Sequence, residues 1–508
     1  MTHLAVIALR DSRSFRWMGL GLTILVAGCA VGPDFVRPSA PVVAGYTAEP
    51  LPAQTAGNSS SRRGAQHFLL GHDIPAKWWK LFRSSTLNAL VEQALRANPD
   101  VVSAQAVLRQ AQENVRAQEG LFFPSVQANL ASSRQKNAVQ VISPTLTSGD
   151  AIFNLHTPQV TVTYQLDAWG GNRRQVESLQ AQTESDQFQL EATYLTLSAN
   201  VVTAAVQEAS LRAQIAATDT VIKLQSEQLA ILRRQNELGA IAMADVAAQA
   251  AALAQSEAAL PPLQKQLAIQ RDLLSRLSGH LPGEESGPEF TLSSLQLPLE
   301  LPVSLPSSLV EQRPDVRAAE ANMHAASALI GVATANMLPQ LTLSANAGAT
   351  ATQFRQLFAA GAGFWGVAAG LTQPLFDGGA LLHRKKAAEA AFGQAAAQYR
   401  GTVLTAFQNV ADALYALHSD ANAVAASTRA ERAAAESLTI ALKVVQLGST
   451  SYVALLNAEQ AYQQTLSTLA QAQASRYVDT VALFQALGGG WWNRTEVASG
   501  LQSAPIVE

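Results

Sequence analysis

The sequence predicts a mainly α-helical fold with four β-strands, arranged as two similar halves. Two long stretches, residues 173–237 and 380–447, contain no proline, so each can form one continuous helix. Four shorter segments alternate apolar and polar residues, which is typical of strands. Motifs of the first half recur in the second, which indicates that one supersecondary unit is used twice.

The repeat is visible as a nearly constant offset between matching motifs. Asn98-Pro99-Asp100-Val101 matches Arg313-Pro314-Asp315-Val316 at an offset of 215, and Leu238-Gly239 matches Leu447-Gly448 at an offset of 209. The offset changes between these pairs, which places a short insertion in the loop-like stretch 134–157. The period is far longer than that of a solenoid repeat.

The strand-like segments come in pairs, one pair in each half. Residues 126–130 and 160–166 alternate in the first half, and residues 341–347 and 365–371 alternate in the second. Each segment keeps one apolar face, as the period of two in a strand requires.

A long helix and then a second helix follow each strand pair. Gly239 and Gly448 stand where the long helices should end, because glycine favours the left-handed C-terminal cap. The second helices are expected to reach Ser278 and Leu487. Helices of this length need lateral partners, as in a coiled coil, and the abundant Ala and Gln suit close packing beside a polar, weakly charged face.

We expect five segments along the chain. They are a lipoprotein signal peptide (1–28), a lipidated extended leader (29–76), a first structural repeat (77–295), a second structural repeat (296–490) and a C-terminal tail (491–508). Prolines and a Ser/Gly patch predict that the leader contains no helix.

The first 28 residues read as a secretion signal, in which three arginines precede a short apolar stretch at 17–26. Leu25-Val26-Ala27-Gly28-Cys29 resembles a bacterial lipobox, which implies cleavage before Cys29 and lipid on its sulfur. The alternative is an ordinary signal peptide with a stray cysteine. Ala30, in place of an aspartate, resembles an outer-membrane address.

Composition excludes several classes of protein. Of 508 residues only 14% are charged, with a net charge of −3, so the chain is neither a disordered acidic protein nor a basic nucleic-acid binder. The single cysteine excludes a disulfide framework. Histidines are scattered without metal-ligand spacing, and no catalytic set is visible. We therefore expect no enzyme activity, no metal and no cofactor beyond the lipid on Cys29.

The strands are the only candidates for crossing a membrane. After the signal no apolar run reaches roughly 18 residues, so a helical span is excluded. Only helices and closed barrels satisfy backbone hydrogen bonds in lipid, and a barrel needs about eight strands, so several chains would have to contribute. The alternative, a soluble sheet, fits the periodicity equally well; the outer-membrane address favours the barrel.

Basic residues stand at the start of both long helices, where they oppose the helix dipole. They are Arg173-Arg174 in the first half and Arg384-Lys385-Lys386 in the second. We interpret both runs as a solvated or membrane-proximal face.

Five ordered motifs carry a family resemblance over about residues 29–490. They are Cys29-Ala30-Val31-Gly32-Pro33-Asp34-Phe35, Trp78-Trp79-Lys80-Leu81-Phe82, Ala94-Leu95 to Pro99-Asp100, Leu166-Asp167-Ala168-Trp169-Gly170-Gly171 and Pro374-Leu375-Phe376-Asp377-Gly378-Gly379. In this order, together with the repeat, they resemble the TolC-like outer membrane efflux proteins, in particular the lipoprotein branch called NodT-type or OprM-like.

The resemblance implies a homotrimer whose three chains close a twelve-stranded barrel in the outer membrane. Their helices would form a long hollow coiled-coil barrel across the periplasm. Solute would arrive from an inner-membrane pump through a periplasmic adaptor, also called a membrane fusion protein. The turns at Leu238-Gly239 and Leu447-Gly448 would be the periplasmic tips, where the adaptor docks and where splaying of the helices opens a gate.

The tip departs from the family pattern. Members often narrow the closed tip with acidic side chains on the helix after the second turn, but the matching positions here are Ala454 and Asn457. The matching position of the first unit, six residues after Gly239, is Asp245. Our hypothesis is that Asp245 carries the charge of the tip and helps to hold it shut. The alternative is that Asp245 acts only on the helix dipole.

The leading prediction is a passive duct for drugs or other toxic small molecules. A periplasmic adaptor or coiled-coil scaffold lipoprotein is the alternative, disfavoured because adaptors have one helical hairpin flanked by small β-domains. A lipid-anchored enzyme is disfavoured by the missing catalytic set. The sequence does not name the exported compound or the partner pump.

Overall fold

The computed structural model describes most of the chain, in seven stretches: residues 30–43, 45–50, 52–56, 64–136, 152–284, 287–447 and 452–494. Cys29, the predicted signal peptide, Gly448 and all but the first residues of the predicted tail lie outside them. The contacts divide the chain into two units. Unit 1 comprises Met1–Arg37, Arg109–Ser185 and Glu320–Gln398, and unit 2 comprises Pro38–Leu108, Asp186–Ala319 and Tyr399–Glu508. Each unit takes segments from both halves of the sequence.

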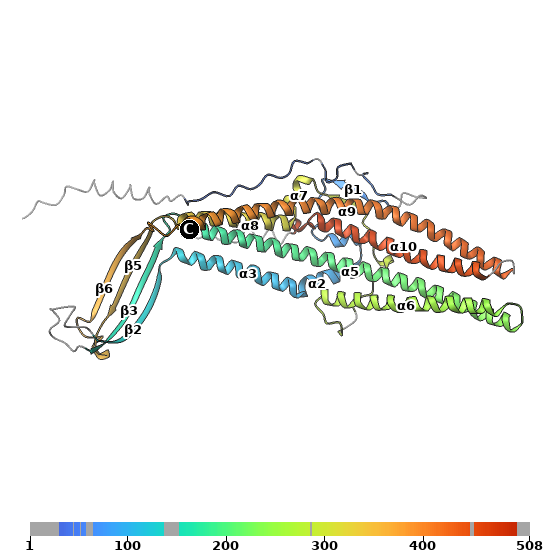
Figure 1. The fold of residues 1–508 in the computed structure, drawn as a ribbon, viewed down its shortest axis with the longest axis horizontal. Coiled ribbons are helices and arrows are strands. Elements are labelled where there is room, and N and C mark those ends of the chain that lie inside the picture. The colour runs from blue at the N-terminus through green and yellow to red at the C-terminus, as the bar shows by residue number, and fades with distance from the viewer. Residues whose placement is uncertain are drawn as a thin grey trace, which may run out of the picture. The chain divides into compact units, whose positions relative to one another are not determined.

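Unit 1 contains an antiparallel sheet of four strands in the order β2-β3-β5-β6 (Figure 1). The strands are β2 (Ser125–Lys136), β3 (Ile152–Leu166), β5 (Gln340–Ala349) and β6 (Gly363–Thr372). They contain the four segments that the sequence predicts as strands. Successive hairpins give β2-β3 and β5-β6, and β3 pairs with β5 to join the two halves.

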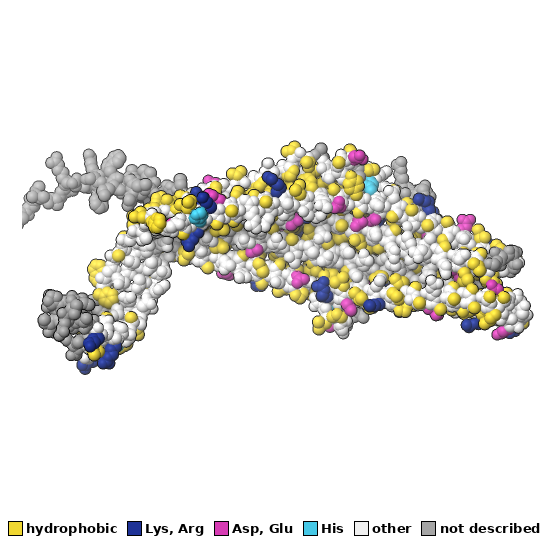
Figure 2. Space-filling model, viewed as in Figure 1, with side chains coloured by type: hydrophobic (Ala, Val, Ile, Leu, Met, Phe, Trp, Pro, Cys, Tyr) yellow, Lys and Arg dark blue, Asp and Glu magenta, His cyan; other side chains and the backbone are white. Residues whose placement is uncertain are grey.

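The register of this sheet separates an apolar face from a polar one. Val126, Val162, Ala345 and Val367 are aligned across the four strands, whereas the next row begins with Gln127. Side chains aligned in this way share a face. All of β2 is exposed, so described residues of the chain cover neither face of this strand. Few charged side chains follow the strands on the face shown in Figure 2.

The long helices form two hairpins. The first is α5 (Gly171–Glu237) with α6 (Met243–Leu277), and the second is α9 (Ala380–Gln446) with α10 (Tyr452–Ala486). Both long helices have 67 residues and both returning helices have 35. Helix α6 continues through Pro261 and Pro262. The first residues of α5 and α9 belong to unit 1 and the remainder to unit 2.

Shorter helices complete the fold. They are α2 (Ser85–Ala97), α3 (Pro99–Glu119), α7 (Pro306–Gln312) and α8 (Pro314–Ala335), with 3₁₀ turns η1 (Trp78–Phe82), η2 (Gly120–Phe122), η3 (Leu292–Ser294), η4 (Phe354–Gln356) and η5 (Trp491–Asn493). Helices α3 and α8 begin at Pro99 and Pro314, two prolines that match in the repeat, where the missing N–H costs nothing. Asn98 Oδ1 accepts a hydrogen bond from the Asp100 N–H at 2.8 Å, which caps α3.

The leader is better integrated than the sequence suggested. Its described residues form no helix, but His67–Leu70 forms strand β1, which pairs in parallel with β4 (Glu300–Val303). The prediction of an extended, helix-free leader did not include this pairing, because the partner strand lies more than two hundred residues away in the sequence. Within the described residues, none of the helices combines the length and apolarity needed to cross a bilayer.

Candidate functional site

The turn between α5 and α6 has the geometry that its sequence predicts. Gly239 adopts a left-handed φ of 74°, and the Ala240 N–H donates to Gln235 O at 2.9 Å. These features terminate a helix by satisfying its last carbonyls. Leu238 is 69% exposed, and Leu447, at the matching turn of the second hairpin, is 78% exposed. Each hairpin therefore has a solvent-exposed leucine side chain at its turn.

The two hairpins touch near these turns through Tyr452, the first residue of α10. The Tyr452 hydroxyl donates to Gln235 Oε1 on α5 at 2.8 Å. Burial raises the pKa of Tyr452, and the negative charge of Asp245 raises it further. Asp245, in the first turn of α6, is thus brought within electrostatic reach of the second hairpin, whereas Asn457 lies exposed on α10. The gating role of either residue remains a prediction.

Each hairpin has an apolar cluster of its own close to the turn. Leu229, Leu232 and Val246 form a buried cluster between α5 and α6. Leu438, Leu455 and Ala458 form a second between α9 and α10. Tyr452 packs against both clusters. Because apolar burial favours association in proportion to area, each hairpin holds together as a unit.

A buried arginine in unit 1 holds the first residues of the leader. Arg174 pairs with Asp34 at 2.7 Å and with Glu177 at 2.7 Å, and its Nε donates to Val31 O at 3.2 Å. The Val31 N–H donates to Trp169 O at 3.0 Å. Arg174 is 5% exposed, so the solvated alternative is wrong for this residue, and the membrane-proximal alternative stays a prediction. Its partner Glu177 lies one helical turn away, but Asp34 is 140 residues distant in the sequence, so local sequence could not pair it with Arg174.

The same stretch of leader also contacts α8. Phe35 stacks on His324, with ring centroids 4.5 Å apart, and Arg37 pairs with Glu320 at 2.7 Å. We call residues 30–37 together with Arg174 the first clasp. Sequence reasoning missed it, although Asp34 lies within a motif that carries the family resemblance and Arg174 follows another, which ends at Gly171.

A second buried arginine, in unit 2, holds a later part of the leader. Arg476 on α10 donates from Nε to Gln66 Oε1 at 3.0 Å and from Nη2 to Thr55 Oγ1 at 3.2 Å. Gln66, fully buried, donates in turn to Pro298 O at 3.0 Å. We call Arg476, Gln66 and Thr55 the second clasp.

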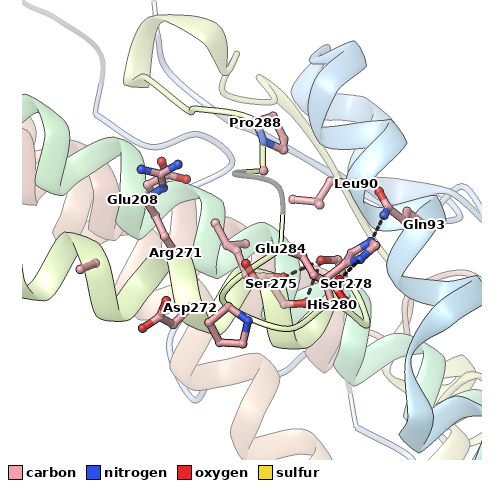
Figure 3. A pocket seen from close by; sticks show the side chains of 14 residues that line it. Leu90, Gln93, Glu208, Arg271, Asp272, Ser275, Ser278, His280, Glu284 and Pro288 are labelled. Atoms are coloured by element: carbon pink, nitrogen blue, oxygen red, sulfur yellow. Dashed lines mark hydrogen bonds and ion pairs between the residues drawn. The ribbon is translucent and has the colours of Figure 1, made fainter.

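A pocket of about 500 Å³ lies among α2, α5, α6 and the segment after α6 (Figure 3). His280 Nδ1 lies 2.9 Å from Glu284 Oε2, and the other ring nitrogen bonds with Gln93. Burial raises the pKa of Glu208, whereas its hydrogen bond with Arg212 lowers it. Among the described residues no group of His, Cys, Asp and Glu could hold a metal ion.

The sequence matches the family model described as outer membrane efflux protein over residues 90–280 and 305–489. The chain belongs to the outer membrane efflux protein family. It is therefore an outer membrane channel component of an efflux system. The matched residues cover both hairpins and the four strands, which confirms the predicted family, location and mainly helical fold with a β part.

Named relatives agree with this assignment. The toluene efflux pump outer membrane protein TtgC of Pseudomonas putida is 28% identical, with 94% of this chain and 95% of TtgC aligned. Outer membrane protein OprJ of Pseudomonas aeruginosa is 26% identical over 94% of this chain and 96% of OprJ. The relatives are channel components, so the alternative of a periplasmic adaptor is not supported.

Solved structures share the fold. The outer-membrane channel OprN has a TM-score of 0.80 at 28% identity and covers 91% of this chain and 100% of its own. The CmeC outer membrane channel of Campylobacter jejuni has a TM-score of 0.82 at 20% identity, over 93% of this chain and 98% of CmeC.

Proposed function

We propose that this protein is a homotrimeric, passive duct that exports small molecules without an energy source of its own. The observation that carries the proposal is the four-stranded sheet, whose register separates an apolar face from a polar one and whose edge strand β2 is exposed along its whole length. Its edge strands, β2 and β6, can pair with further copies of the chain. Three copies supply twelve strands, enough to close a barrel, with apolar side chains on lipid and polar side chains on the water-filled lumen.

The duct is proposed to receive its solute from an inner-membrane pump through a periplasmic adaptor. The exposed Leu238 and Leu447 at the two hairpin turns offer apolar contacts of the kind that docking surfaces use. The exported solute is proposed to be a toxic small organic molecule, because TtgC is named for toluene efflux.

The chain is further proposed to be anchored by lipid on Cys29. Ala30, the next residue, lies against Gly170 at the corner between β3 and α5, since a side chain added at Gly170 would meet Ala30 at 2.6 Å. The first clasp fixes this position. Acyl chains starting there would enter the bilayer beside the strands, where each buried CH₂ contributes about 0.8 kcal/mol.

Conductance and assembly test the channel. The full-length protein, purified from outer-membrane fractions, should run as a heat-modifiable trimer and give ion conductance in planar bilayers. A monomer released into the soluble periplasm would contradict the proposal.

Acyl labelling tests the anchor. Cys29→Ala should abolish incorporation of labelled fatty acid while the protein remains an outer-membrane trimer. Persistent labelling would refute the assignment of Cys29.

The gate at the turns is proposed to be held shut in part by Asp245, which lies within electrostatic reach of Tyr452. Asp245→Ala should raise single-channel conductance, with Asp219→Ala, at an exposed position of α5, as the matched control. Unchanged conductance and unchanged drug resistance in Asp245→Ala would show that the carboxylate acts only at the helix N-terminus.

A further inference from the structure

Polar contacts follow the line where α5 of the first hairpin packs against α10 of the second. Three hydrogen bonds cross it: Ser210 Oγ to Ala470 O at 3.5 Å, Gln471 Nε2 to Gln214 Oε1 at 2.9 Å, and Tyr452 Oη to Gln235 Oε1 at 2.8 Å. Two of these bonds lie close together at Ser210 and Gln214, and the third lies near the turns at Gln235. We call these residues, with Gln225, Gln249 and Glu459, the polar seam.

Glu459 is the acidic residue of the polar seam, and its side chain is poorly hydrogen-bonded. Its side chain is fully buried, and among the described residues the amides of Gln225 and Gln249 approach its carboxyl group without the geometry of a full hydrogen bond. Gln225 of α5 and Gln249 of α6 face it, and their amides partly offset the rise that burial causes in the pKa of Glu459.

The side-chain amides of Gln225 and Gln249 also lack most of their possible hydrogen bonds. Gln249 Nε2 donates to the backbone oxygen of Gln225 at 3.2 Å. Within the described part of the chain, both polar side-chain atoms of Gln225 and the side-chain oxygen of Gln249 lack partners. A buried polar group without a partner costs free energy that contact with water restores.

The seam contrasts with the interiors of the hairpins that it joins. The clusters of Leu229, Leu232 and Val246 in one hairpin and of Leu438, Leu455 and Ala458 in the other are apolar. Separating α5 from α6 would expose one of these clusters. Separating α10 from α5 and α6 would uncover Tyr452, which packs against both clusters, but it would also hydrate Glu459 and the amides of Gln225 and Gln249, which offsets part of that apolar cost.

We propose that Glu459 biases the tip toward its open state, because parting of the hairpins lets water reach a carboxyl group that their packing desolvates. Glu459 is thus a positioning residue of the gate that acts against closure, the opposite sense to Asp245. This inference rests on the gate proposed above at the two turns.

Single-channel recording tests the direction of the effect. The full-length lipidated trimer in planar bilayers should show an open-to-closed ratio about 5- to 150-fold lower in Glu459→Leu than in the wild type, because leucine removes the buried polar cost of about 1–3 kcal/mol. Glu459→Gln should lower the ratio less, since the amide remains buried and polar. Gln460→Leu, at an exposed position of the same helix, should leave it unchanged.

The sign separates this role from a merely structural one. Loss of a stabilising contact would loosen the tip and raise the open fraction, so an unchanged or higher ratio in Glu459→Leu overturns the proposal.

Amide hydrogen exchange supplies a readout that does not depend on conductance. Amides of residues 455–463 in the detergent-solubilised trimer should exchange more slowly in Glu459→Leu than in the wild type. If the wild type fails to conduct, the duct proposal fails, while the exchange result still decides the role of Glu459: equal or faster exchange in the variant counts against it.

Discussion

Two buried arginines hold the leader, one in each unit, and they do so with different chemistry. Burial lowers the pKa of Arg174, but its hydrogen bonds with Asp34 and Glu177 raise it more, so the net shift is upward. Arg476 binds the neutral oxygens of Gln66 and Thr55, and burial shifts its pKa downward. The same residue type thus serves as an ion-pair clasp in unit 1 and as a neutral clasp in unit 2.

This difference indicates how much free energy of unfolding is lost when each clasp is removed. The carboxylate of Asp34 is 92% exposed, so water can replace Arg174 as its partner. Gln66 and Thr55 are buried, and water cannot reach them without opening the packing. A polar group that has lost its hydrogen-bond partner destabilises the fold most where water is excluded. Removal of Arg476, whose partners are neutral and buried, should therefore destabilise the protein more than removal of Arg174.

Arg476→Met should therefore have the largest effect. It leaves Gln66 Oε1 and Thr55 Oγ1 without the arginine donor and should lower the free energy of unfolding by about 2–4 kcal/mol. Thermal unfolding and limited proteolysis of the leader measure the loss. Arg429→Met, at an exposed position of α9, is the control. Equal stability of Arg476→Met and Arg429→Met would contradict the importance of the second clasp.

Arg174→Met should have a smaller effect, about 1–2 kcal/mol, because its partners are partly solvated. The deficit should shrink in high salt, which screens the exposed side of the pair, whereas the deficit of Arg476→Met should not. Proteolysis of residues 30–37 at low and high salt measures both. A salt response shared by the two variants would remove the distinction between the clasps.

Asp420 should make the stability of unit 2 depend on pH. Burial and the neighbouring Asp479 raise the pKa of Asp420 to about 7, against the opposing charge of Arg476. A raised folded-state pKa means that protonation stabilises the fold, fully below about pH 4 and not at all above about pH 7. Asp420→Asn should flatten this decline of Tm with pH; parallel Tm profiles for variant and wild type would show that Asp420 is not responsible.

The hydrophobic period and the positions of proline and glycine predicted the helices and strands whose pattern is local in the sequence. The alternation from Val126 onwards predicts a strand face, and the absence of proline in 173–237 predicts α5, because both signals act over a few residues. Gly239 likewise marks the end of α5 through its own φ. Such features are readable from the chain because their cause lies within a helical turn or a strand.

Features that join distant segments were not predictable in this way. Asp34 and Arg174 are separated by 140 residues, and His67 pairs in β1 with a strand that begins at Glu300. Short elements such as α7 carry too few residues for a period to be visible. Burial of Glu459 is equally hidden, because a glutamate on an Ala/Gln-rich helix normally faces water.

The uncovered sheet of unit 1 also constrains the order in which the protein can be assembled. The helical hairpins have apolar clusters of their own, whereas Val126 and Val367, at the two ends of the apolar row that also contains Val162 and Ala345, are 66% and 76% exposed. Edge strands with apolar side chains invite aggregation. In the proposed trimer, the strands of each protomer are therefore completed only where lipid and two further copies of the chain are present.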